Sequence, residues 1–130
     1  MTHEQHGRDC EPLRGVLARV GDRWTIVILM ALAGRRLRFK DLHRAVGGIS
    51  QRMLTVTLRN LERDGLVERI AYPTVPPRVD YELSDRGHSL KDALAPVAAW
   101  AAAHRDGIAE SRRRFDGKAL AAAAPTLIRW

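Results

Sequence analysis

Between residues 50 and 64 the apolar positions follow a helical period. Leu54, Leu58 and Leu61 recur at the i, i+4, i+7 spacing that places side chains on one face of a helix. Ser50 is suited to cap this helix at its start and Gly65 to end it. The opposite face is polar and is formed by Gln51, Arg52, Thr55, Arg59 and Arg63. The pattern predicts a helix that packs one face inward and presents hydrogen-bond donors and positive charge on the other.

Three more helical patterns precede this segment. The first covers residues 12–20. The second covers residues 22–34, where Asp22 is suited to cap a helix with a broad apolar face, the expected centre of the core. The third covers residues 39–46 and leads into the tight turn Gly47-Gly48. Two helices joined by a short glycine-containing turn indicate a helix-turn-helix.

Beyond Gly65 the period changes from helical to alternating. Residues 66–72 are rich in β-prone side chains, and apolar and charged side chains alternate strictly over residues 78–83. The segment between them, residues 73–77, contains three prolines, which stiffen the backbone and favour extended conformations. The pattern predicts a β-hairpin with a rigid tip, placed as a wing beside the helix-turn-helix.

A long apolar stripe follows over residues 85–106, with Pro96 expected to bend or break the helix. A small winged domain has little core left for this stripe, so we expect the same helix of a second subunit to cover it. Packing against the chain's own first helix is the alternative. After Gly107 the periodic signal fades into an arginine-rich turn, residues 112–114. The expected dimer interface consists of Leu90, Leu94, Val97, Trp100, Ala101 and His104.

The predicted fold class is mainly α with a small β-hairpin wing (α+β). We expect a winged helix-turn-helix with N- and C-terminal dimerisation helices over residues 11–106, the C-terminal one at about residues 85–106. Residues 1–10 are expected to form a flexible N-terminal arm, and residues 107–130 a variable tail without an assigned function. The length of 130 residues suits one domain of this kind.

Charge sharpens the functional prediction. The net charge of +7 favours a polyanionic partner, with a basic surface that serves only solubility as the alternative. Residues 35–80 carry ten basic and five acidic side chains, a net charge of +5. The positive charge is therefore concentrated on the predicted helix-turn-helix and wing, where double-stranded DNA is the expected partner.

The predicted DNA contacts fall into two groups. Gln51, Arg52, Thr55 and Arg59 are expected to read base edges, and Ser50 to cap the helix and contact a phosphate. Arg52 suits a guanine edge and Gln51 an adenine edge, each with about 1–3 kcal/mol of discrimination. For each residue a solvated helix position is the alternative. Contacts to phosphates or the minor groove are assigned to Lys40, Arg69, Thr74 and Arg78.

Other classes of function find little support. The sequence shows no Ser/His/Asp arrangement, metal-ligand spacing or phosphate-binding loop, which argues against an enzyme, and no metal or cofactor is predicted. A winged helix used only for docking to another protein is the main alternative. No apolar run approaches the roughly 20 residues that span a bilayer, and the N-terminus lacks a hydrophobic signal core. We expect a cytoplasmic protein without membrane association.

Several motifs occur together and in order along the chain. They are Gly21-Asp22-Arg23-Trp24-Thr25, Arg38-Phe39 with Leu42, Gly48-Ile49-Ser50-Gln51-Arg52-Met53-Leu54-Thr55, Asp64-Gly65-Leu66-Val67 with Arg69, Val75-Pro76-Pro77-Arg78-Val79 with Tyr81 and Leu83, and Gly87. As a set they resemble the HxlR-type winged helix-turn-helix transcriptional regulators, relatives of the MarR group. The resemblance covers about residues 10–105. It implies a bacterial, homodimeric regulator, with repression as the expected mode, that binds an inverted-repeat operator.

Cys10 is the only cysteine, so no disulfide can form within one chain. The family usually places a cysteine immediately before the proline of the first helix, and in some members this thiol senses oxidants or electrophiles. Here Glu11 precedes Pro12, and Cys10 lies one residue earlier. Neighbouring acids oppose the thiolate that sensing needs. Cys10 is therefore a candidate redox sensor with an unspecialised thiol as the alternative, and the effector, small molecule or oxidant, is unidentified.

Overall fold

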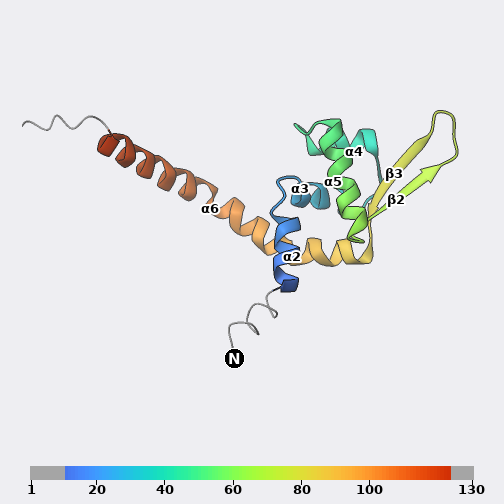
Figure 1. Cartoon of the computed structure of the whole chain (residues 1–130), viewed down its shortest axis with the longest axis horizontal. Coiled ribbons are helices and arrows are strands. Elements are labelled where there is room, and N and C mark those ends of the chain that lie inside the picture. Colours follow the sequence, from blue (N-terminus) through green and yellow to red (C-terminus); the bar gives the residue numbers. More distant parts are fainter. Residues whose placement is uncertain (1–10, 124–130) are drawn as a thin grey trace, which may run out of the picture. The chain divides into compact units, whose positions relative to one another are not determined.

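The computed structural model describes residues 11–123, mainly helical with one small sheet (Figure 1). Cys10 lies outside the described residues. The chain divides into two compact units between Leu94 and Ala95. The predicted fold class, helices with a hairpin wing, is confirmed. The elements in chain order are α2 (Glu11–Val20), α3 (Thr25–Ala31), β1 (Leu37–Arg38), α4 (Phe39–Val46), α5 (Gln51–Arg63), β2 (Val67–Tyr72), β3 (Arg78–Leu83) and α6 (Asp85–Ala123).

The core of the first unit lies among α3, α4 and α5. The predicted stripe of α5 is buried, with Leu54, Leu58 and Leu61 at most 1% exposed. Full burial of such a side chain contributes about 1.5–3 kcal/mol, so this face fixes α5 firmly to the domain. The other fully buried apolar side chains in the described part of this unit come from α3, from the residue after it and from α4: Ile28, Leu29, Leu32 and Leu42.

The second predicted helix begins later than expected. The Asp22 side chain accepts a hydrogen bond from the backbone N–H of Trp24 at 2.9 Å, so it stabilises a turn. α3 starts at Thr25, and Trp24 occupies the N-cap position without a side-chain cap. The prediction that Asp22 caps the helix directly was therefore wrong by two residues, because its carboxylate is used before the helix begins.

The sheet has three antiparallel strands in the order β1-β3-β2. The hairpin of β2 and β3 was predicted, and its register pairs Val67 with Leu83 and Tyr72 with Arg78. β1 was not predicted, because two residues are too few to show an alternating pattern. Leu37 and Arg38 of β1 pair with Tyr81 and Asp80 of β3. This short strand ties the start of α4 to the wing.

The last helix is longer than the sequence pattern suggested. α6 continues through Pro96 without a break and through residues 112–114 to Ala123, so the predicted arginine-rich turn is wrong. Glu110 accepts hydrogen bonds from Arg113 at 2.7 Å and from Arg114 at 3.2 Å, the i,i+3 and i,i+4 pairs that support a helix. Arginine and alanine are also good helix formers. These local preferences continue the helix where the apolar period fades.

Candidate nucleic-acid interface

The two faces of α5 differ sharply in exposure. Opposite its buried leucines, Gln51, Arg52, Thr55 and Arg59 are all exposed. Ser50 is also exposed, and its hydroxyl accepts a hydrogen bond from the Met53 N–H at 3.0 Å, which confirms it as the N-cap. The Thr55 hydroxyl donates to the Gln51 carbonyl at 2.9 Å, so its oxygen is left to act as an acceptor. The predicted reading residues therefore share one solvent-exposed surface.

The turn between α4 and α5 sets the start of this surface. Gly47 and Gly48 have φ values of 68° and 76°, a conformation that favours glycine. Directly after them Ile49 is buried, and its carbonyl lies 2.7 Å from His43 Nε2. The buried Ile49 side chain and the contact of its carbonyl with His43 of α4 together fix the turn. The start of α5 is thus anchored to the preceding helix as a helix-turn-helix requires.

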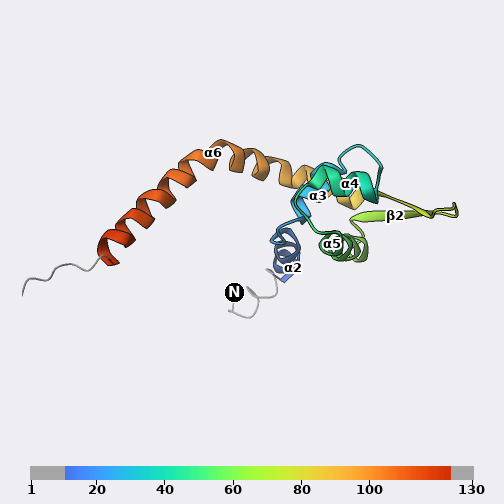
Figure 2. The ribbon, with the colours of Figure 1, turned by 90° about the horizontal axis from the view of Figure 1, so that it is seen from above.

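The wing projects beyond α4 and α5 (Figures 1 and 2). Arg69, Thr74 and Arg78 are exposed on it, and Lys40 is exposed in the first turn of α4. The Thr74 hydroxyl donates to the Pro76 carbonyl at 3.0 Å, inside the hairpin tip. In Figure 1 the start of α5 and the tip of the hairpin lie at the same side of the first unit. All nine predicted DNA contacts are solvent-exposed, on the helix-turn-helix and the wing.

Arg78 is held in place by the protein itself. Its Nε and Nη2 donate to the two carboxylate oxygens of Asp80 at 2.9 Å and 3.0 Å, and its guanidinium lies 5.2 Å from the centre of the Tyr72 ring. The hydrogen bond from Arg78 holds the pKa of Asp80 below its ordinary value, against the effect of its burial. The same pairing raises the pKa of Arg78. Asp80 is a buried partner that sequence reasoning missed, because strand alternation does not identify which charges pair.

A second arginine pairs across the sheet. Arg36 donates to the Glu82 carboxylate at 3.1 Å and 3.3 Å and to the Tyr72 hydroxyl at 3.0 Å. These hydrogen bonds, the one to Glu82 foremost, raise the pKa of Arg36. Arg36 thus links the residues before β1 to both strands of the wing. Its positive charge is compensated by Glu82, so it adds little to the attraction for an anion.

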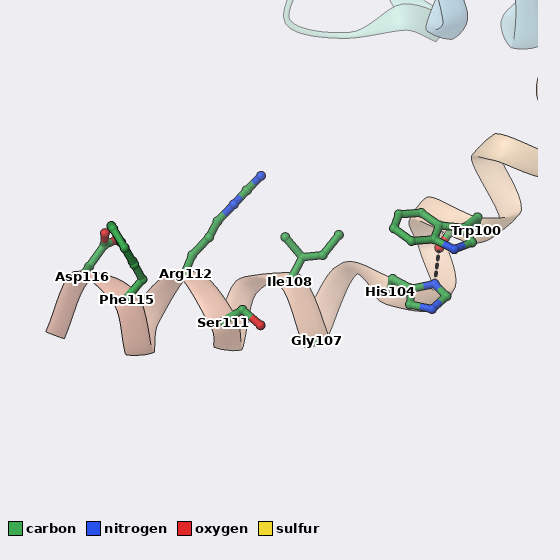
Figure 3. Close-up of a pocket in the computed structure, with 8 residues that line it drawn as sticks. All are labelled: Trp100, His104, Gly107, Ile108, Ser111, Arg112, Phe115 and Asp116. Carbon is green, nitrogen blue, oxygen red and sulfur yellow. Dashed lines mark hydrogen bonds between the residues drawn. The ribbon is translucent and has the colours of Figure 1, made fainter. Parts of the chain in front are cut away.

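The predicted dimer residues divide into two sets. Leu94 is buried in the core of the first unit and Leu90 is half-buried against it, so neither needs a partner to cover it. Val97 and Trp100 are 55% and 56% exposed, and Ala101 and His104 are exposed as well. The Trp100 and His104 rings stack with centres 4.2 Å apart. Figure 3 shows them at one end of a hollow of about 610 Å³, whose other lining residues are Gly107, Ile108, Ser111, Arg112, Phe115 and Asp116.

A helix-turn-helix with an exposed basic reading face, next to a hairpin wing, defines the winged helix-turn-helix class of DNA-binding folds. The chain belongs to the HxlR-like helix-turn-helix family, whose model matches residues 19–108. It is a transcriptional regulator with a DNA-binding fold and not an enzyme. No helix in the described part of the chain has the length and apolar character needed to cross a membrane.

Relatives with similar sequences are also transcriptional regulators. The chain is 46% identical over 89 residues to the HTH-type transcriptional regulator YtfH of Escherichia coli, which covers 68% of this chain and 71% of YtfH. It is 44% identical over 92 residues to the HTH-type transcriptional regulator YtcD of Bacillus subtilis, covering 71% of this chain and 73% of YtcD.

Solved structures agree with this assignment. The transcriptional regulator ytfH from Salmonella typhimurium superposes with a TM-score of 0.71 at 40% identity, covering 78% of this chain and 91% of that one. The redox regulator HypR in its reduced form gives a TM-score of 0.71 at 33% identity, covering 77% of this chain and 99% of HypR. The family resemblance expected from the motifs is confirmed.

Proposed function

We propose that the protein binds an inverted-repeat operator in double-stranded DNA as a homodimer and represses transcription from the cytoplasm. One observation supports the DNA-reading role above all: α5 exposes Gln51, Arg52, Thr55 and Arg59 while its leucine face is buried. Arginine and glutamine are the side chains that recognise guanine and adenine edges in the major groove. The wing residues Arg69, Thr74 and Arg78 then contact the flanking phosphates or minor groove.

The exposed apolar residues support the homodimer. Leu13, Val16 and Leu17 of α2 are 47–56% exposed, and Trp100 and Phe115 of α6 are 56% and 71% exposed. Large apolar side chains exposed along a helix are commonly covered by a partner, and a second copy is the simplest cover for each of these two helices. A two-fold dimer places two reading helices on two half-sites, which is why we propose an inverted repeat. Val97, Trp100, Ala101 and His104 are proposed to form its α6 contact.

Cys10 is proposed as the switch of this regulator. The observation that favours it is the similarity to the redox regulator HypR and, at 33% identity, to the regulator YodB of Bacillus subtilis in reduced and diamide-treated forms. Because each chain has one cysteine, peroxide would oxidise two Cys10 thiols of a dimer to one disulfide, with two water molecules as product. Operator affinity should change on oxidation in wild type and stay constant in Cys10→Ser. Identical responses in both proteins would overturn the switch.

The proposed DNA-binding function is tested by titration. The full chain is mixed with a duplex from upstream of its own gene and with a random duplex of equal length, each at several salt concentrations. We expect tighter binding to the upstream duplex, with two chains per site, and repression of a reporter that carries it. Equal affinity for both duplexes, or no binding, would favour a docking module instead.

A further inference from the structure

A pocket separates the wing tip from the start of α4. Its volume is about 530 Å³. On one side it is lined by Arg38, Phe39 and Lys40, and on the other by the hairpin residues Thr74, Val75, Pro76, Pro77, Arg78 and Val79. We propose that this pocket binds a single phosphate of the DNA backbone, with Arg38 and Lys40 as its charged ligands. The proposal rests on the proposed DNA-binding function, and it adds Arg38 to the residues that carry that function.

Charge pairing singles out Arg38 and Lys40. Arg78 is bound to Asp80, and Arg36 to Glu82, so the charges of both arginines are compensated within the protein. Neither Arg38 nor Lys40 forms an ion pair with any residue between 11 and 123. Both side chains are exposed. The pocket therefore presents two cations without an anionic partner in the described chain.

The acids near the pocket are already engaged. Asp41, in the same helical turn as Lys40, lies 4.0 Å from Arg44. Asp80 is 1% exposed, and both of its carboxylate oxygens accept hydrogen bonds from Arg78. Arg38, its partner across the strands, acts on it through charge without forming an ion pair. Arg78 closes one wall of the pocket, and its bidentate bond to Asp80 fixes the plane of its guanidinium. An anion that enters meets the positive charges of Arg38 and Lys40 on one side and the guanidinium of Arg78 on the other, where the net charge is reduced by Asp80.

The position of the pocket points to the DNA strand as the source of the anion. The pocket lies between two elements that are both proposed to contact DNA, the helix-turn-helix and the wing. When a reading helix occupies the major groove and a wing the neighbouring minor groove, one sugar-phosphate strand passes between them. A phosphate of that strand is the group within reach of Arg38 and Lys40. The bond would fix the register of the wing relative to α5.

Salt dependence tests the proposal. Full-length wild type, Arg38→Gln, Lys40→Gln and Arg44→Gln are titrated with the upstream and random duplexes over a salt series. Each lost phosphate contact should reduce the slope of log K against log salt by about 0.9. We expect this reduction in Arg38→Gln and Lys40→Gln with both duplexes. Arg44→Gln is the matched control, because Arg44 is exposed on the same helix but does not line the pocket, and its slope should stay at the wild-type value.

A chemical change in the DNA locates the phosphate. Neutral methylphosphonates are introduced one at a time along the upstream duplex. At one position the methylphosphonate should weaken DNA binding by wild type. At the same position it should not weaken DNA binding by Arg38→Gln any further, because this variant has already lost the contact. The phosphate-binding role of the pocket would be overturned if both pocket variants kept the wild-type salt slope. It would also be overturned if each methylphosphonate weakened DNA binding by Arg38→Gln as much as it weakens binding by wild type. Either result would leave the proposed function intact. Failure of wild type to bind either duplex would overturn both.

Inorganic phosphate distinguishes a free anion from the DNA strand. It replaces chloride at constant ionic strength in the wild-type and Arg38→Gln titrations. We expect the same duplex affinity in both buffers. A saturable loss of duplex affinity that occurs in wild type and is absent in Arg38→Gln would assign the pocket to a free anion and contradict the proposal.

Discussion

Arg78 and Asp80 form a bidentate ion pair at the base of the wing, with Nε 2.9 Å from Oδ1 and Nη2 3.0 Å from Oδ2. Asp80 is buried, whereas the Arg78 side chain is 42% exposed. The buried carboxylate therefore orients an arginine whose side chain remains partly open to solvent. We propose that Asp80 is a positioning residue, which acts on DNA through Arg78.

Removal of Arg78 alone should harm both stability and DNA binding. Arg78→Ala leaves the buried Asp80 carboxylate without its partner, which is a costly state. We expect a lower midpoint of thermal unfolding and weaker binding to every duplex. The double variant Arg78→Ala/Asp80→Asn should regain much of the stability without regaining affinity. If the single and double variants unfold at the same temperature, Arg78 and Asp80 do not stabilise each other as their geometry indicates.

The same pair predicts a response to acid. The pKa of Asp80 is lowered in the folded protein by the hydrogen bond from Arg78, so the native state binds fewer protons than the unfolded chain. The pair's stabilisation is present above the ordinary aspartate pKa of about 3.9 and is lost as the pH falls through the lower folded value. The free energy of unfolding measured in urea should therefore fall more steeply from neutral pH to about pH 3 for wild type than for Asp80→Asn. Asp106→Asn, at a fully exposed carboxylate, should match the wild-type profile.

Local periodicity was sufficient to predict the elements that carry a long pattern. The stripe of Leu54, Leu58 and Leu61 fixed both the length of α5 and the face that it exposes. The sequence could not predict which charged side chains pair with one another. The pairing of Arg78 with Asp80 depends on which side chains the strand places together, and nothing in the alternation of residues 78–83 distinguishes Asp80 from Glu82.

The unpredicted elements have physical causes of the same kind. β1 exists because β3 offers an open edge to Leu37 and Arg38, a tertiary effect on two residues with no pattern of their own. The end of α6 is helical because Glu110 pairs with the arginines that follow it. The spacing of apolar residues gives no sign of such pairs. For the candidate site, exposure of the predicted contacts follows from the sequence, but the pocket of Arg38 and Lys40 requires the fold.

Sequence preference should depend on Arg52. Arg52→Ala is expected to lose discrimination at one base pair of the operator, about 1–3 kcal/mol or about 5- to 150-fold. Affinity for random duplex should fall much less. The measurement is a set of titrations with single-base variants of the upstream duplex. Arg63→Ala is the control, because Arg63 is exposed in the last turn of α5. An unchanged base preference in Arg52→Ala would remove this residue from the reading surface.

Gly87 should tolerate no side chain. A Cβ at this position would lie 2.0 Å from the Leu66 carbonyl oxygen and 3.3 Å from Leu83 Cβ. Gly87→Ala must therefore displace backbone, and we expect a marked fall in the midpoint of thermal unfolding. Gly117→Ala is the control within the same helix, where a Cβ meets nothing within 4 Å and better helix propensity adds up to about 1 kcal/mol. Equal stability of the two variants would contradict the close packing of Gly87 against Leu66.

Self-association should depend on the exposed stripe of α6. Trp100→Glu places a charge on a residue that is 56% exposed in the single chain, so folding should be preserved while the proposed dimer contact is lost. Sedimentation equilibrium should give the mass of two chains for wild type and a concentration-dependent shift toward one chain for the variant. Arg105→Glu is the control, at an α6 side chain that is 85% exposed and outside the stripe. A dimer unaffected by Trp100→Glu would place the interface elsewhere.

The most direct test of DNA reading compares two titrations of full-length wild type at one fixed salt concentration, one with the upstream duplex and one with the same duplex after its inverted repeat has been scrambled. We predict that scrambling weakens binding by about 10³-fold or more, the range typical of specific over non-specific DNA binding. We also predict two chains per intact site. Equal affinity for the intact and scrambled duplexes would contradict the proposed reading of an inverted repeat.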